Sequence, residues 1–321
     1  MHLKLRQDDR SVILSVRWLM VCCLTVCVMI GEEDVGLTTP PAPFDVAKLF
    51  PELAGKSKVA VRLHPRSGAP SPADSSMGGP LLWPIGDPWP FCTSPDHADF
   101  TGAQPIAMVP ILQLHARDVP ELPFPPDTDV CQILWCPFVH ESDFRPVVRV
   151  LWRKTSLVTE LLTEVPKPVA SEEGLLPQPC VLSPERVKEY PAWETSAELA
   201  EKIEEWESSL NDSAEWSYQY HLSAAPGTKI GGWIDWIQSP ETVTCDQGHE
   251  MAHLLTIASW EYDPGSAMRW VPLEERHLLS SDFDPKQMSP SGLMIGDAGA
   301  AYLFVCVECP DRPIGSVAQW S

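Results

Sequence analysis

The stretch Ser76-Met77-Gly78-Gly79 recurs in altered form as Lys229-Ile230-Gly231-Gly232, and this pair of segments decides the predicted architecture. In each copy a Trp lies four residues, and a Cys thirteen residues, after the second Gly: Trp83 and Cys92 in the first copy, Trp236 and Cys245 in the second. Spacing that repeats over more than one residue type is typical of a duplicated segment.

The match continues downstream of these motifs. Residues 127–137 align without a gap on residues 297–307, which places Cys136 on Cys306. We therefore predict a β-rich α+β protein with two pseudo-equivalent β units that arose by internal duplication, and one long helix between them.

Local patterns divide the chain into four parts. Residues 1–43 contain an apolar segment and a Pro-rich linker and are expected to lie outside the fold; 44–152 form the first half, 153–227 a connecting segment, and 228–321 the second half. Within the connecting segment, Pro184 at a first helical position predicts a short helix over 183–186. A capping-box pattern at 195–198 predicts the long helix, which runs to about Leu210 and carries an exposed acidic face.

The N-terminal apolar run admits two interpretations. Residues 11–30 are apolar except for Arg17, and they are followed by Glu32, Glu33 and Asp34 without a cleavage pattern. The run is either an extension upstream of the true start, in which case the protein is cytoplasmic, or a membrane anchor.

Composition narrows the class of partner. The formal net charge of -21 argues against nucleic acid, because phosphate binding requires Lys and Arg. A basic protein or peptide is a compatible partner, and so is the simpler interpretation that the charge keeps the protein soluble. With 34 Pro and 13 Trp, the chain is expected to be rich in loops and strands.

Eight Cys and His residues form short-spaced pairs that resemble metal ligands. The pairs are Cys92 with His97 and Cys136 with His140 in the first half, and Cys245 with His249 and Cys306 with Cys309 in the second. Zinc takes four such donors in a tetrahedron, commonly as two short-spaced pairs from separate turns. The duplication predicts that Cys92 meets Cys136 and that Cys245 meets Cys306. The alternative is that the cysteines are small core residues and the histidines surface residues.

Evidence for catalysis is weak by comparison. The chain has no G-x-S-x-G elbow, P-loop or G-x-G-x-x-G motif. Trp83 and Trp236 either line equivalent grooves or belong to the core. Cys131 and Cys180 have no partner at ligand spacing and are expected in the core.

Several of these motifs resemble the bacterial YwqG-like family, a domain of unknown function. The resemblance spans about residues 45–321 and rests on the Gly-Gly motifs, on segments 110–114 and 119–125, and on Gly296-Asp297-Ala298-Gly299 followed by residues 302–306. The family is similar to programmed cell death protein 2 and its relatives, which are chaperones for a basic ribosomal protein. Relatives often carry a Cys where this chain has Gln247, so His249 would have to substitute in a second-half zinc site. The resemblance implies no catalytic residues.

Together these patterns predict a protein that acts by binding, as a chaperone-like or adaptor module for a basic protein segment. An extended peptide would dock along a strand edge or between the lobes. The alternative is a zinc-dependent enzyme with an open metal position.

Overall fold

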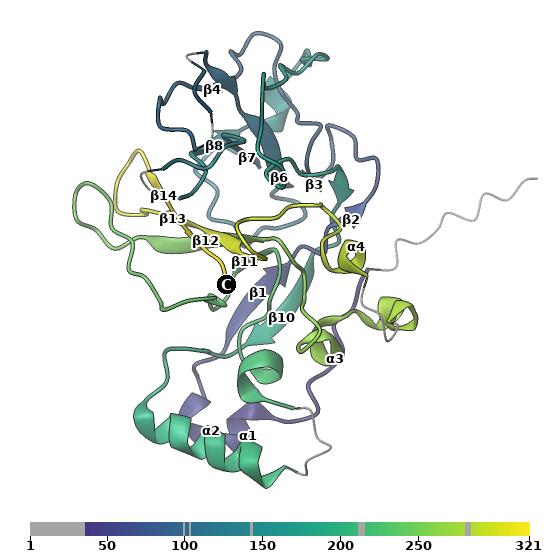
Figure 1. Cartoon of the computed structure of the whole chain (residues 1–321), viewed down its shortest axis with the longest axis vertical. Coiled ribbons are helices and arrows are strands. Elements are labelled where there is room, and N and C mark those ends of the chain that lie inside the picture. The colour runs from purple at the N-terminus through teal and green to yellow at the C-terminus, as the bar shows by residue number, and fades with distance from the viewer. Residues whose placement is uncertain (1–35, 99, 103, 142–143, 211–215, 280–283) are drawn as a thin grey trace, which may run out of the picture. The chain divides into compact units, whose positions relative to one another are not determined.

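The structure is a computed structural model, and it describes residues 36–321 apart from 99, 103, 142–143, 211–215 and 280–283. The described chain is a strand-rich, mixed α+β fold built on two open six-stranded sheets (Figure 1). In spatial order, sheet A contains β10 (Glu185–Glu189), β1 (Lys58–Arg62), β11 (Lys229–Gly231), β12 (Ala252–Ala258), β13 (Ala300–Val305) and β14 (Ile314–Gln319). Sheet B contains β2 (Arg66–Ser67), β9 (Cys180–Val181), β3 (Ser76–Met77), β6 (Val109–His115), β7 (Val130–Trp135) and β8 (Val148–Arg153).

The two sheets have the same order of connection. Neighbouring strands are antiparallel throughout, and β3-β6-β7-β8 in sheet B corresponds to β11-β12-β13-β14 in sheet A. The two sheets also exchange one strand each. The chain passes from β1 in sheet A to β2 in sheet B, and later from β9 in sheet B to β10 in sheet A. Both crossings occur at a Leu-x-Pro sequence, at residues 63–65 and 182–184.

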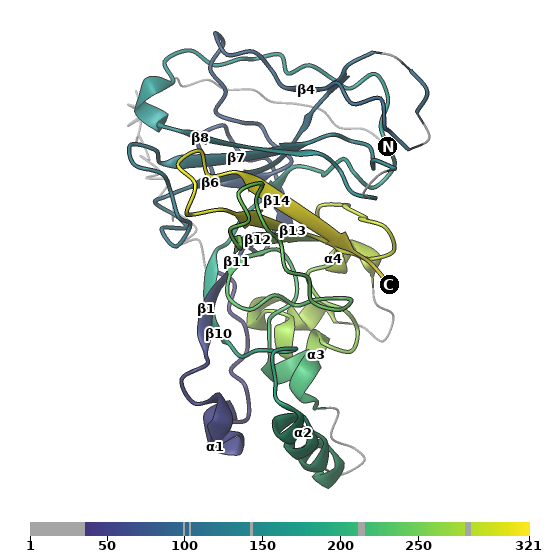
Figure 2. The same ribbon diagram turned by 90° about the vertical axis from the view of Figure 1, so that its left-hand side faces the viewer.

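One hydrophobic core lies between the sheets, which are stacked in Figure 2. Because successive side chains of a strand point to opposite faces, Ile133 of β7 and Leu303 of β13 enter this shared core. Leu134 and Phe304 instead join separate clusters on the outer faces of sheets B and A. The same alternation places Cys136 and Cys306, which directly follow these strands, on the outer faces.

The remaining elements are short and surround the sheets. A two-stranded ribbon, β4 (Phe91–Cys92) with β5 (Ile106–Ala107), covers the outer face of sheet B. The helices are α1 (Val46–Leu49), η1 (Pro51–Leu53), η2 (Thr155–Leu157), α2 (Ala197–Ser209), η3 (Tyr218–Leu222), α3 (Ala267–Trp270), η4 (Leu273–Leu278) and α4 (Pro285–Met288). At the start of α2, the Ser196 hydroxyl accepts a hydrogen bond from Leu199 N at 3.3 Å. Leu199 then packs against Phe50 and Tyr218.

The short helix predicted over 183–186 is wrong. Residues 185–189 form β10, which pairs with β1 in the register Lys58 to Glu189. Pro184 precedes the strand, where its missing N–H costs no ladder hydrogen bond, so the pairing with β1 prevails over the local helix signal.

The twin glycines occupy positions that other residues would not fit. Gly78 and Gly232 have φ of +75° and +71°. A Cβ on Gly78 would lie 2.6 Å from Gln178 O, and one on Gly232 would lie 2.6 Å from the Ala60 Cβ. Each glycine thus permits a close approach between its turn and a neighbouring segment.

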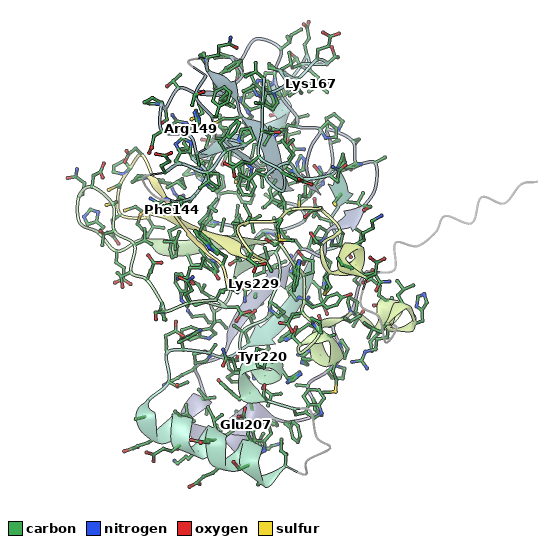
Figure 3. All side chains as sticks on the ribbon, in the orientation of Figure 1. Phe144, Arg149, Lys167, Glu207, Tyr220 and Lys229 are labelled. Carbon is green, nitrogen blue, oxygen red and sulfur yellow. The ribbon has the colours of Figure 1, made fainter. Side chains whose placement is uncertain are left out.

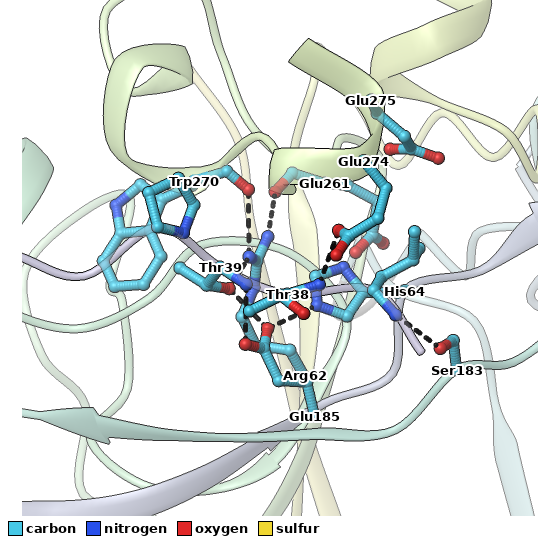
Figure 4. Close-up of polar contacts among 12 residues, drawn as sticks. Thr38, Thr39, Arg62, His64, Ser183, Glu185, Glu261, Trp270, Glu274 and Glu275 are labelled. Carbon is cyan, nitrogen blue, oxygen red and sulfur yellow. Dashed lines mark hydrogen bonds and ion pairs between the residues drawn. The ribbon is translucent and has the colours of Figure 1, made fainter. Parts of the chain in front are cut away.

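The expectation that residues up to 43 lie off the fold is wrong for residues 36–43. Thr39 is buried, and its backbone N–H donates to Glu185 Oε1 at 2.6 Å (Figure 4). The Thr39 hydroxyl accepts from the Arg62 guanidinium at 2.9 Å, and Leu273 N donates to Thr38 O. Buried polar groups in this region need these backbone partners, which is why the linker packs against the body. Residues 1–35 lie outside the described part.

Among the described residues, none of the helices combines the length and apolar character needed to cross a bilayer. The apolar run at 11–30, on which the anchor interpretation depends, is not among them.

Candidate metal centres

The first Cys/His cluster lies on the outer face of sheet B. Cys92 ends β4, held by its pairing with Ile106 of β5, and Cys136 directly follows β7. A bridge between His97 and His140 then joins the two loops that leave these strands. Four donors from two separate hairpins therefore converge.

The geometry of this first cluster suits a small metal ion. Its four ligand atoms lie within 4.8 Å of one another, and all four residues are buried. Cys92 Sγ is 3.7 Å from His140 Nε2, and the His97 and His140 rings are 4.7 Å apart. The Nε2 atom of His97 is buried without a hydrogen-bond partner among the described residues. A buried ring nitrogen lacking a partner is costly unless it binds something, so it supports a metal at this position.

The two thiols of the first cluster shift each other's pKa values in opposite directions. The Cys136 thiol, together with the Ser94 backbone and His97, lowers the pKa of Cys92 to about 5 against the opposing effect of burial. The same contact and burial raise the pKa of Cys136. The contact thus favours ionisation of one thiol of the pair, and thiolate is the form that binds zinc.

The second cluster occupies the corresponding position on the outer face of sheet A. Cys245 and His249 flank a tight turn in which Cys245 N donates to His249 O at 3.0 Å and Gly248 adopts a φ of +80°. Cys306 directly follows β13, and Cys309 lies in the next turn, where its carbonyl accepts from Arg312 N.

Donor separations in the second cluster match a tetrahedron. Cys245 Sγ is 3.8 Å from Cys309 Sγ, and His249 Nδ1 is 3.7 Å from Cys306 Sγ and 3.4 Å from Cys309 Sγ. Tetrahedral zinc with bonds of about 2.0 to 2.3 Å requires separations of about 3.5 to 3.8 Å. His249 is the fourth donor of this cluster and its exposed member.

In the second cluster the pKa of Cys245 is lowered and that of Cys309 is raised. Desolvation acts to raise the pKa of Cys245, but the backbone N–H groups of His249 and Gln247 and the neighbouring thiols bring it down to about 7. Burial and the adjacent Cys306 and Cys245 raise the pKa of Cys309 to about 12. A divalent ion would remove this competition for negative charge by stabilising all the thiolates together.

The structure therefore brings the eight predicted residues together in the two predicted sets of four. Either set can hold a metal ion. All seven cysteines of the described part are free, so no disulfide competes for these sulfurs. Cys131 and Cys180 lie apart from both clusters, in the shared core.

The two tryptophans do not share one role. Trp83 is 1% exposed and packs against Trp89 at 4.7 Å, so it does not line an open groove. Trp236 is also buried, but it borders a cavity on the outer face of sheet A.

Buried charges beside β1 and β11 were missed by the sequence interpretation. Lys229 Nζ lies 2.7 Å from Glu189 Oε1 with both side chains fully buried, and Figure 3 shows Lys229 amid the strands of sheet A. Arg62 and His64 are buried in the network of Figure 4, where His64 Nε2 is 2.9 Å from Glu185 Oε2. The sequence signal for the Lys229–Glu189 pair was the position of Lys229, directly before an apolar residue and two glycines.

Comparison with known proteins does not assign the chain to a family. Neither a family model nor a curated protein matches this sequence. The resemblance to the YwqG-like family therefore stays a proposal.

Proposed function

We propose that the protein binds one zinc ion in each Cys/His cluster and acts as a binding module, not an enzyme. The observation that carries this proposal is that each cluster offers four protein donors, which fills a tetrahedral coordination shell and leaves no position for a substrate. Zinc in such a closed site stabilises structure.

The proposed zinc ions would fasten long connections that have few other restraints. The first cluster joins the ribbon of β4 and β5 to the end of β7, and the second joins the turn at 245–249 to the end of β13. Both turns lie against outer-face clusters that contain the ligating cysteines. Metal binding would therefore contribute directly to the free energy of folding.

We infer that both halves come from one duplicated unit related to the YwqG-like family. The shared strand order and the equivalent positions of Cys136 and Cys306 support this, as do the matching Leu-x-Pro crossings. In this proposal the second copy begins at β9, earlier than residue 228.

The proposed partner is a basic protein or peptide. The net charge of -21 favours such a partner, and the exposed glutamates of α2 concentrate negative charge on one element: Glu198, Glu201, Glu204 and Glu205. Free thiols beside zinc ligands suit a reducing compartment, so we propose a cytoplasmic location. Membrane anchoring through residues 11–30 is the alternative.

One observation favours a second candidate function, a zinc-dependent enzyme. His249 is exposed, whereas the cysteines of its cluster are buried or nearly so. A substrate or water that displaced this histidine would gain access to the metal. Under the main proposal a His249→Cys variant keeps its zinc and its partner binding; loss of a detectable hydrolytic activity in that variant would favour the enzyme.

Metal analysis of the purified full chain tests the main proposal. We expect two zinc ions per chain, one in Cys136→Ala and one in Cys306→Ala. Cys131→Ala is the matched control, because it removes an equally buried thiol outside both clusters and should retain both ions. Protein that contains no zinc, and takes up neither zinc nor cobalt after reduction, would overturn the proposal.

A further inference from the structure

A cavity of about 410 Å³ opens on the outer face of sheet A, and none of the eight Cys and His residues of the candidate metal centres lines it. Its wall combines charged and aromatic side chains, the main ones being Lys229, Asp235, Trp236, Trp260, Tyr262 and Asp263. A cavity of this size with a few convergent polar groups is typical of a ligand site.

The only lysine in the wall is already neutralised. Lys229 Nζ contacts Glu189 Oε1 at 2.7 Å, and Glu189 also accepts from Ala225 N at 2.9 Å and Trp233 N at 2.8 Å. Because both members of this buried pair are satisfied, they attract neither an anion nor a cation into the cavity.

Asp235 gives the cavity its net charge. Its carboxylate makes no hydrogen bond or ion pair with a described residue, and burial raises its pKa to about 6. The ionisable groups that face it are the Lys229–Glu189 pair, Asp263 and Tyr302. Asp263 accepts from Ser266 N through Oδ1 and is the second acidic group of the wall. With the ion pair balanced, two carboxylates are left without a positive partner.

Aromatic rings complete a surface that suits an organic cation. Trp260, Tyr262 and the half-exposed Tyr220 line the cavity with Trp236. Rings of this kind attract ammonium and guanidinium groups through their negative faces, most strongly where water is excluded.

The corresponding region of sheet B is closed by its own side chains. The row Ser76, Gln113 and Gln132 has the register of the row Lys229, Thr256 and Tyr302. There Gln113 Oε1 accepts from Leu82 N at 2.6 Å and from Gln132 at 2.8 Å. The Arg153 guanidinium lies 4.3 Å from the Trp83 ring and covers it. Among the described residues no cation covers Trp236 in the same way.

We propose that the sheet A cavity binds the cationic head of an arginine or lysine side chain presented by a basic peptide. The carboxylate of Asp235 provides the counter-charge, and the aromatic wall encloses the alkyl chain. The inference rests on the basic partner of the proposed function and names its point of attachment. It does not depend on zinc.

Binding of a capped arginine to the purified full chain tests this inference. The probe is N-acetyl-arginine methylamide, its neutral isostere is the citrulline analogue, and the readout is fluorescence of the cavity tryptophans together with calorimetry. We expect the arginine probe to bind at least tenfold more tightly than the citrulline probe, and Asp235→Asn to abolish the difference. Glu164→Gln removes an equal charge at an exposed site outside the cavity and should leave it intact. Affinity should rise about tenfold from pH 5 to pH 7, because Asp235 must ionise.

Each outcome is decisive. Equal affinity for both probes, or arginine binding that survives in Asp235→Asn, would overturn the cavity proposal. Free arginine that binds as tightly as the capped form would identify a small-molecule amine as the occupant and also overturn the peptide assignment. The probe could bind as expected while no peptide of a basic peptide array binds in a way that Asp235→Asn weakens. That result would support the cavity as a site for a cationic group and would overturn the proposed basic protein partner.

Discussion

Replacing Lys229 by Met removes one member of the fully buried pair with Glu189 while keeping the side-chain volume nearly constant. Breaking a buried ion pair by removing one partner costs about 3 to 5 kcal/mol, since the remaining charge is left uncompensated. Glu189 keeps two backbone donors, from Ala225 and Trp233, so the lower end of that range applies. We therefore expect a loss of about 3 kcal/mol in the free energy of unfolding, which corresponds to a fall of about 5 °C in Tm for a fold of this size.

Thermal and urea unfolding of the purified protein measure this loss. The double variant Lys229→Met with Glu189→Gln should be more stable than Lys229→Met alone, because the neutral amide removes the buried charge and its oxygen still accepts from one of the two backbone donors, Ala225 N or Trp233 N. The matched control is Lys202→Met, which breaks the exposed pair with Glu52 and should leave the free energy of unfolding nearly unchanged, because solvent screens such pairs. A Lys229→Met variant as stable as this control, or a double variant weaker than the single one, would refute the reasoning.

Two further predictions concern the network of Figure 4. Burial lowers the pKa of His64 to about 4, well below its ordinary 6.5, so the native state excludes a proton that the unfolded state binds. The free energy of unfolding should therefore fall by about 3 kcal/mol as the pH drops from about 7 to 4. His64→Gln should flatten this dependence in urea titrations measured at each pH. A slope unchanged in His64→Gln would show that other groups, Glu185 among them, govern the acid sensitivity. Thr39→Val should cost about 1 to 3 kcal/mol, because it strips a buried hydroxyl from Arg62 and Glu185. Thr38→Val, at an exposed side chain, is its control and should be neutral, and equal stability of the two variants would show that segment 36–43 contributes nothing through this contact.

The metal clusters illustrate what sequence spacing can predict. Cys136 and Cys306 each directly follow a strand that is buried along its whole length, and the gap-free alignment of 127–137 on 297–307 predicts equivalent positions for them. His140 and Cys309 must lie close to Cys136 and Cys306, because only a turn separates the two members of each pair. The short spacing within each pair and the match between the two segments were therefore sufficient to predict the two sets of four that the structure brings together.

The cavity and the buried charges could not be found in this way. Asp235 acquires its environment from Tyr262 and Asp263, which are distant in the chain and belong to loops with no periodic signal. Residues 36–43 resemble a linker because of their prolines, yet Thr39 meets Arg62 and Glu185 through long-range contacts. Propensity describes a segment by itself, whereas burial depends on which segments the fold brings beside it.

The strand exchange is a further feature that the sequence does not indicate. β9 is two residues long and its partners, β2 and β3, lie in the first half, so nothing beside it in sequence marks it as a strand. The exchange has a physical consequence as well. Removing β9 with the second half would expose edges of β2 and β3, and removing β1 with the first would separate β10 from β11. Since the inner faces of both sheets also share one core, neither half can complete its strand pairing or bury its apolar face alone. The two halves are therefore expected to fold as one unit. Their outer faces, which carry the candidate metal centres and the sheet A cavity, lie outside both the shared core and the strand exchange.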